Sequence, residues 1–451
     1  MKKDNTKEIA LAYHAEPVPG KIALKLTKKC ETQQALSLAY TPGVATPCLE
    51  IKDNPKNVWR YTAKGNLVAV VSDGTAVLGL GNIGPEAGMP VMEGKGVLFK
   101  RFADVDALPI CLKDVFLDNG KTDPNKLIET VKRLEPTFGG INLEDIAAPA
   151  CFEIEQQLKK DLSIPVFHDD QHGTAIISLA AIINTLKIID KKIEDCKFVI
   201  NGAGAAGIAC SEYYITAGAK RENFMLCDSK GVINSKRRNL TPEKKRFADT
   251  THTNAKTLKE AMIGADIFIG LSVPGCVTQE MICSMASDPV IFAMANPTPE
   301  IFPEEALKAG ASVVGTGRSD FPNQINNVLG FPGIFRGALD VRATDINFEM
   351  KLAASVALAD IAAEKIPEDI YAILSSAYPE DAANGVFDGE CPIKAAYVIP
   401  KPFDPRVVPR VARNVAEAAM KTGVAQLYVE DLDVYEKFVT ERIQDLIKTL
   451  S

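Results

Sequence analysis

Two histidines and two aspartates lie within five consecutive residues of this sequence, and both residue types bind metal ions. The segment runs from His168 to His172 and reads HDDQH. Histidines four residues apart bind zinc when both lie on one face of a helix. Here Ile164–Phe167 favours a strand, and Gly173-Thr174 favours the start of a helix. We therefore expect the two histidines to be separated, which disfavours zinc.

Two other interpretations of the segment remain open. Asp169 and Asp170 could cap the following helix, or they could bind a hard cation, Mg²⁺ or Mn²⁺, through carboxylate oxygens. A cation needs further oxygens, and the best donors are Glu144 and Asp145, which follow a short β-like run. This acidic pair could also be a solvated turn. Neighbouring carboxylates repel unless a cation or a proton lies between them, so Glu144, Asp145 and Asp170 form the candidate metal site.

A glycine pattern typical of nucleotide-binding loops, GxGxxG, occurs twice, at 79–84 and at 202–207. The first is followed by Pro85, Gly88, Pro90 and Gly94, residues that disfavour a long helix. We therefore interpret 79–94 as a turn-rich loop. The second follows an apolar strand and opens a long apolar helix, as a dinucleotide-binding turn does.

In the second pattern, each glycine has a physical role. Gly202 allows the tight turn, Gly204 lets a pyrophosphate approach the backbone, and Gly207 lets helix and strand pack closely. The first helical turn, from Ala205, offers free N–H groups to phosphate; the remaining alternative is a glycine-rich turn without a ligand.

Asp228 ends the next strand and could accept hydrogen bonds from a ribose hydroxyl, which favours NAD. Lys230 and the basic run Lys236–Arg238 could instead receive a 2′-phosphate. NAD and NADP both remain possible.

Alternating strands and helices must position these residues. From His172 onward, strand-like and helix-like segments alternate, which predicts a doubly wound parallel sheet of the Rossmann type. The segment before it mixes helices, loops and short strands, which predicts a separate α/β domain. We divide the chain into an N-terminal catalytic domain (1–165), a dinucleotide-binding domain (166–400) and a C-terminal helical segment (401–451) that could pack back on the first domain.

The composition of the chain limits the kinds of partner that it is expected to bind. The chain has 451 residues, with 51 Lys and Arg against 58 Asp and Glu, for a net charge of −7. The acidic balance and the absence of a long basic run argue against nucleic acid and acidic membranes. No signal-like segment or uninterrupted apolar span is apparent, and the ten cysteines form no CxxC pair. We expect a cytoplasmic protein that acts on a small molecule.

Five ordered motifs resemble malic enzyme in its shorter bacterial-type form: SLAYTPGVATPCLEI, EGKGVLFKRFADVDALPICL, INLEDIAAP, FHDDQHGTA and NGAGAAG. The resemblance extends from about Ala12 to about Val424. It implies a malic-type N-terminal domain, a homodimer or larger assembly, and oxidative decarboxylation of malate to pyruvate. The implied cofactors are NAD or NADP with Mg²⁺ or Mn²⁺.

The resemblance also assigns roles to residues. Its tyrosine acid corresponds to Tyr40 and its lysine base to Lys95, which we expect to be partly neutral if it is buried. The other implied roles are metal ligation by Glu144, Asp145 and Asp170, pairing of Asp169 with the lysine, and substrate contact through Lys95, Asn296 and Asn327. One departure is Ala76, where larger members of the family carry a carboxylate-binding arginine.

Two further functional hypotheses remain. A metal-assisted 2-hydroxy-acid dehydrogenase would share the cation and the nicotinamide but would stop at the keto acid. A dinucleotide-binding sensor would need neither an acid nor a base, so the combination of Tyr40, Lys95 and the three carboxylates argues against it.

Overall fold

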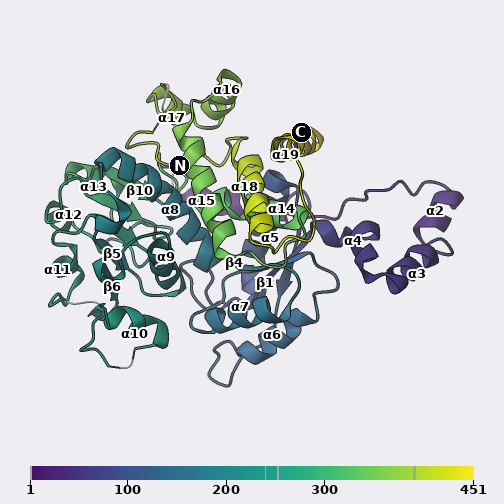
Figure 1. The fold of residues 1–451 in the computed structure, drawn as a ribbon, viewed down its shortest axis with the longest axis horizontal. Coiled ribbons are helices and arrows are strands. Elements are labelled where there is room, and N and C mark those ends of the chain that lie inside the picture. Colours follow the sequence, from purple (N-terminus) through teal and green to yellow (C-terminus); the bar gives the residue numbers. More distant parts are fainter. Residues whose placement is uncertain (1–2, 239, 251–252, 390–392, 451) are drawn as a thin grey trace.

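A computed structural model describes residues 3–238, 240–250, 253–389 and 393–450. Two β-sheets form the body of the molecule, with helices around each, and an N-terminal arm projects from one side (Figure 1). The predicted combination of a Rossmann-type sheet and a second α/β unit is confirmed.

The first sheet is parallel and lies in the N-terminal half. Its strands, in spatial order, are β2 (Asp106–Cys111), β1 (Leu67–Ser72), β3 (Gly140–Leu143) and β4 (Val166–His168). Side chains along β1 alternate between two cores. Val68 and Val70 face the core that contains helix α5 (Pro85–Ala103), whereas Ala69 and Val71 face α6 (Pro124–Lys132) and α7 (Ala150–Asp161). This period of two is what a strand covered on both faces requires.

Helix α5 (Pro85–Ala103) corrects our interpretation of 79–94 as a loop without a long helix. Pro85 occupies the first helical position, where the missing N–H costs nothing. Pro90 lies inside the helix, and its carbonyl accepts a hydrogen bond from Lys21 Nζ at 2.6 Å. Gly96 lets the helix approach the sheet, since a Cβ there would lie 3.1 Å from Ala107 O. Tertiary packing therefore outweighs the poor helix propensity of the segment.

The second sheet has six strands and lies in the following part of the chain. Their order is β10 (Val313–Thr316), β9 (Val290–Ala293), β8 (Ile267–Gly270), β5 (Phe198–Asn201), β6 (Phe224–Asp228) and β7 (Gly231–Val232). All pairs are parallel except β6–β7. The intervening helices are α9 (Ala205–Thr216), α10 (Pro242–Ala248), α11 (Leu258–Met262), α12 (Gln279–Cys283) and α13 (Pro303–Lys308).

Helix α8 (Asp169–Ile189) links the two sheets. It follows β4 directly, and its body packs against α9 and α15 (Phe348–Ala363). The helix starts before the predicted Gly173-Thr174, and the interior Gly173 fits because a Cβ there would overlap Asp169 and crowd Asn327. The helix is long and apolar enough to cross a membrane, but 67% of that apolar window is buried inside the protein, as in the core helix of a globular domain.

The C-terminal helices pack on the first sheet's side of the molecule. Helix α18 (Val407–Lys421) lies against α14 (Phe331–Asp340) and α15, and α19 (Leu432–Leu450) lies against α18 and α5. Arg442 on α19 donates to Asp104 Oδ2 at 2.7 Å and to Asn66 Oδ1 at 3.1 Å. The tail is thereby tied to the N-terminal half. Helices α16 (Glu368–Ala377) and α17 (Pro379–Ala383) form a small lobe beyond α15.

The projecting arm contains α2 (Gln33–Ala39), α3 (Ala45–Asp53) and α4 (Val58–Tyr61). Helix α1 (Lys3–Ala15) precedes the arm and lies against the body, where its His14 lines a pocket together with Pro90 of α5. Helices α2 and α3 stand well away from the body (Figure 1), and neither contains a buried residue. Several apolar side chains along the arm are exposed, among them Leu24, Leu26, Leu36, Leu38, Tyr40 and Leu49. A large exposed apolar surface of this kind marks a contact with another molecule.

The bonds from Arg442 make a testable contribution to stability. We expect Arg442→Met to lower the free energy of unfolding by about 1–2 kcal/mol, because three hydrogen bonds from a charged, partly buried side chain, two to Asp104 and one to Asn66, are lost. Lys437→Met on the same helix is the matched control, since its exposed pair with Glu441 at 3.8 Å contributes less than about 0.5 kcal/mol. Denaturant unfolding of both variants checks this, and equal losses would contradict it.

Candidate active site

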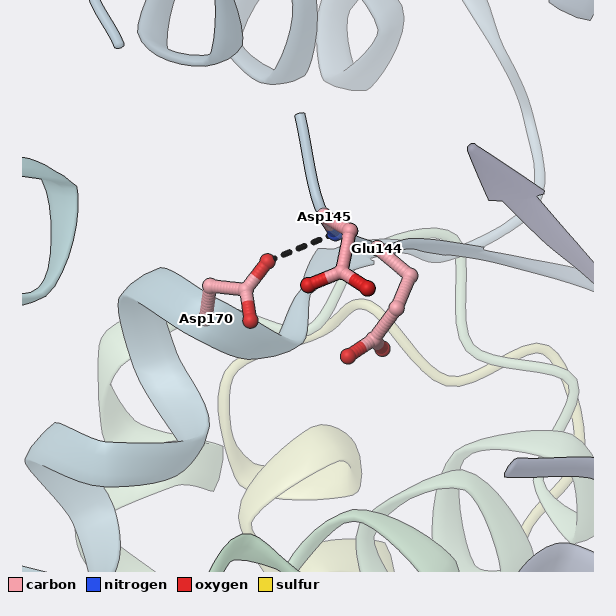
Figure 2. A group of neighbouring side chains, drawn as sticks. All are labelled: Glu144, Asp145 and Asp170. Atoms are coloured by element: carbon pink, nitrogen blue, oxygen red, sulfur yellow. Dashed lines mark hydrogen bonds between the residues drawn. The ribbon is translucent and has the colours of Figure 1, made fainter. Parts of the chain in front are cut away.

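Three carboxylates from two separate elements meet at one point (Figure 2). Glu144 and Asp145 follow β3, and Asp170 is the second residue of α8; one oxygen of each lies within 4.8 Å of the others. The backbone N–H of Asp145 donates to Asp170 Oδ2 at 2.7 Å. Asp145 has a φ of +54°, a left-handed conformation that aspartate tolerates better than most residues. The three predicted metal ligands are thus brought together.

The donor set suits a hard divalent cation. Glu144 and Asp145 are buried, and Asp145 Oδ2 has no hydrogen-bond partner among the described residues. Burial and the nearby carboxylates raise the pKa of Glu144 well above its usual value, although Lys95 opposes this. Burial and Asp170 raise the pKa of Asp145 to about 7. A buried anionic oxygen without a partner is costly, and Mg²⁺ or Mn²⁺ coordinated by these oxygens would satisfy it.

Lys95 on α5 lies beside this triad. Its ammonium forms an ion pair with Asp169 and another with Glu144 Oε1 at 3.1 Å, and it lies 4.6 Å from the centre of the Phe331 ring. Burial alone would lower the pKa of Lys95, but Asp169 and Glu144 outweigh it and raise the pKa above the usual value. The surrounding carboxylates thus favour the ammonium form of Lys95, contrary to the expectation that burial leaves it partly neutral.

Asp169 and Asn327 extend the same cluster. Asp169 is fully buried, and its Oδ2 accepts from Lys95 and from Asn327 Nδ2 at 3.0 Å. Asn327 Oδ1 in turn accepts from the Thr174 hydroxyl at 3.2 Å. The predicted pairing of Asp169 with Lys95 is present, and Asn327 reaches the cluster through Asp169.

Two predicted residues lie apart from this cluster. Asn296 is exposed beyond β9, and its carbonyl would be 2.9 Å from a Cβ placed on Gly79, so it lies beside the first glycine-rich loop. Ala76, which precedes that loop, donates its backbone N–H to Asp145 O at 2.9 Å. Tyr40 directly follows α2, which stands away from the body (Figure 1), and its side chain is 70% exposed. A single chain does not bring Tyr40 to Lys95.

The β5–α9 turn has the geometry of a dinucleotide-binding loop. Gly202 has a φ of +117°, and a Cβ there would overlap Leu271 O. The space at Gly204 is open, since a Cβ would meet nothing within 4 Å, whereas a Cβ at Gly207 would overlap Gly202 O. Ala205 begins α9 and packs against the core of the first sheet. These are the tight turn, the ligand approach and the close packing that the sequence predicts.

Asp228 at the end of β6 is already fully bonded. Its carboxylate accepts from Arg237 Nη1 at 2.8 Å and Nη2 at 3.0 Å, from Lys244 Nζ at 3.0 Å and from the backbone N–H of Lys230 at 2.9 Å. Burial alone would raise the pKa of Asp228, but these donors hold it well below its usual value. A carboxylate has about four acceptor sites, so none remains for a ribose hydroxyl.

The two histidines take different roles, and neither belongs to the candidate metal-ligand triad of Glu144, Asp145 and Asp170. His168 ends β4 and precedes the helix, whereas His172 lies inside α8 and bonds Glu155 Oε1 through Nε2 at 2.8 Å. Burial lowers the pKa of His172 to about 4. Sequence reasoning missed Glu155 and the ring of Phe331, because nothing in the local pattern indicates which helices face one another.

Two known protein domains match most of this chain. The description "Malic enzyme, N-terminal domain" matches residues 19–159, and "Malic enzyme, NAD binding domain" matches residues 171–378. The Bacillus subtilis "Bifunctional malic/malolactic enzyme" is 54% identical over 430 residues, which cover 94% of this chain and 96% of that protein. This chain belongs to the malic enzyme family.

Two further members of the malic enzyme family are similar to this chain over nearly its whole length. The "NADP-dependent malic enzyme" of Haemophilus influenzae is 52% identical over 97% of this chain, but the chain spans only 56% of that longer protein. The crystal structure of malic enzyme from Pyrococcus horikoshii superposes with a TM-score of 0.84 at 45% identity, covering 98% of this chain and 96% of that one.

The raised pKa of Asp145 predicts how this malic enzyme family member binds a cation as pH changes. Above about pH 7 Asp145 is ionised and a cation displaces no proton from it; below that pH, the proton of Asp145 must leave. We therefore expect Mn²⁺ affinity to fall as pH is lowered from about 8 to about 6, by up to about tenfold per pH unit for each proton displaced.

Titration calorimetry with Mn²⁺ at several pH values measures this dependence. Asp145→Asn is the control, because it removes the titrating group along with one ligand and leaves weaker binding with a flatter pH profile. An Mn²⁺ affinity that stays constant across the range would contradict the prediction.

Proposed function

We propose that this chain is a divalent-cation-dependent malic enzyme that converts (S)-malate, with NAD(P), to pyruvate and CO₂. The observation that carries the proposal is the junction of three carboxylates, Lys95 and Asp169 at the place where the first sheet meets the dinucleotide-binding domain. Ala205 of the dinucleotide loop packs on the core of that same sheet. Oxidation at C2 and loss of the C4 carboxylate both need this combination of groups.

The residues of the chain divide the chemistry among them. A cation bound by Glu144, Asp145 and Asp170 supplies Lewis-acid stabilisation of the oxygens of substrate and product. Lys95 accepts the C2 hydroxyl proton as hydride leaves for the nicotinamide. Because the neighbouring carboxylates favour the ammonium form of Lys95, its own proton must leave first, and the ion pair with Asp169 offers a carboxylate to receive it. Tyr40 delivers the proton to C3 after CO₂ has left.

The environment of Asp228 favours NADP. Two cations, Arg237 and Lys244, surround one carboxylate whose acceptor sites are filled, and Lys230 follows nearby. A 2′-phosphate would meet net positive charge there, whereas the 2′-hydroxyl of NAD would find no free acceptor on Asp228.

The function is tested by incubating the protein with malate, Mg²⁺ and either coenzyme. We expect equal amounts of NADPH and CO₂, a lower kcat/KM with NAD, and no turnover with EDTA. Lys95→Ala should lower the rate by about 10²–10⁴-fold, the usual contribution of a general base, whereas Lys100→Ala on the same helix should not.

Other outcomes separate the alternatives. NADPH without equal CO₂ would indicate a 2-hydroxy-acid dehydrogenase, and coenzyme binding without turnover would indicate a sensor. An unchanged rate in Lys95→Ala would remove Lys95 from the mechanism.

We also infer that the active species is a homodimer in which the arm of one chain carries Tyr40 to the Lys95 cluster of its partner. Three observations support this: Tyr40 is exposed in its own chain, the arm stands away from the body (Figure 1), and its apolar side chains are uncovered. Burying that apolar surface against a second copy is favourable.

Co-expression of two inactive chains tests the arm directly. In a heterodimer of Tyr40→Phe and Lys95→Ala chains, a shared site would combine the intact Tyr40 of one chain with the intact Lys95 of the other. Random pairing then restores about a quarter of wild-type pyruvate formation. If each site draws both residues from its own chain, every site stays defective and no activity returns.

A further inference from the structure

A buried glutamate joins the two elements that carry the triad. Glu155 on α7 is 7% exposed. Its Oε1 accepts from His172 Nε2 at 2.8 Å and from the backbone N–H of His168 at 3.3 Å, and its Oε2 lies 2.9 Å from the same Nε2. One side chain of α7 therefore bonds both the last residue of β4 and the first turn of α8.

A lysine on α15, Lys351, extends this connection and sets the direction of its hydrogen bonds. Lys351 Nζ on α15 lies 3.3 Å from His172 Nδ1. An ammonium only donates and a carboxylate only accepts, so Nδ1 accepts and Nε2 carries the ring proton. The chain of bonds runs from Lys351 through His172 to Glu155, and it crosses α15, α8 and α7.

This connection joins the two elements that adjoin the triad. Glu144 and Asp145 lie in the loop that leads directly into α7, and Asp170 lies two residues before His172 on α8. The two halves of the triad thus belong to two elements whose carboxylates repel each other when no cation is bound. The direct hydrogen bond between the halves, from Asp145 N–H to Asp170 Oδ2, involves one oxygen that a cation would also use.

We propose that Glu155 and His172 are positioning residues for the metal site: their hydrogen bonds hold α7 and the first turn of α8 at the separation that lets Glu144, Asp145 and Asp170 bind one divalent cation. The inference rests on the metal-binding role proposed for the triad. Neither residue touches the cation or substrate, and both act through the elements to which the ligands are attached. Groups that orient metal ligands commonly change metal affinity when they are removed.

A second tie between the same parts of the molecule provides a matched control. Lys159, one turn further along α7, pairs with Asp345 Oδ1 at 3.0 Å and donates to Ile346 O at 2.9 Å. It joins α7 to the segment before α15 but bonds neither β4 nor the first turn of α8. If the effect of Glu155 and His172 were general docking of the two halves, loss of the Lys159 bonds would reproduce it.

The experiment measures Mn²⁺ binding to the full-length, metal-free protein from the electron paramagnetic resonance signal of free Mn²⁺, with no substrate present. NADP affinity and circular dichroism are measured on the same samples. We expect His172→Ala to weaken Mn²⁺ binding about 10-fold or more, with NADP affinity unchanged within about twofold. His172→Gln should recover most of the loss, because its amide can still donate to Glu155, and Lys159→Met should bind Mn²⁺ as wild type does.

Results that would contradict the positioning role differ from the result that would contradict the metal-binding role of the triad. Wild-type Mn²⁺ affinity in folded His172→Ala, or an equal loss in Lys159→Met, overturns the positioning role while leaving the metal site intact. If His172→Ala does not fold, Glu155→Gln decides: it keeps the size of the side chain but weakens its acceptor, so undiminished Mn²⁺ binding overturns the role. Failure of the wild-type protein to bind Mn²⁺ instead removes the metal role of the triad, and the positioning role with it.

Discussion

Four carboxylates share one corner of this protein, and a single ammonium faces them. Glu144, Asp145, Asp169 and Asp170 lie together, with Lys95 as the cation that pairs with them in the described part of the chain. Because charge of one sign repels strongly at low dielectric, this arrangement is unfavourable unless further positive charge enters. The rest of the site holds these groups in place until such a positive charge binds.

The fold meets this requirement by drawing the acidic groups from rigid elements. Asp169 and Asp170 occupy the first turn of α8, where the helix dipole favours negative charge. Glu144 and Asp145 follow β3 at the carboxyl end of a parallel sheet, the edge at which open α/β folds place ligands. Lys95 comes from a helix that packs tightly on that same sheet, since its Gly96 leaves no room for a side chain. Asp169, Asp170 and Lys95 are therefore held by helices, and Glu144 and Asp145 lie within two residues of the end of a strand.

The sequence predicted much of this because the relevant signals are local. The strand–turn–helix pattern around Gly202, Gly204 and Gly207 and the acidic residues after a strand-like run need few neighbours to be interpreted. Tertiary contacts decided the rest. Helix α5 exists despite Pro90 because it is packed on a sheet, and the protonation of Lys95 follows from which carboxylates surround it. No local motif marks Glu155, because its hydrogen-bond partner His172 lies seventeen residues further along the chain and only the fold brings the two together.

The direct passage from β4 into α8 has a mechanical consequence. One end of this segment is hydrogen-bonded into the first sheet, and the other end packs against α9 and α15 in the second half of the molecule. Because both ends of this continuous segment are packed, bending at the junction of β4 and α8 would disrupt contacts in one half of the molecule or the other. We therefore expect any opening of the site for substrate entry or CO₂ release to occur at other connections, with Asp170 keeping its position relative to the first sheet.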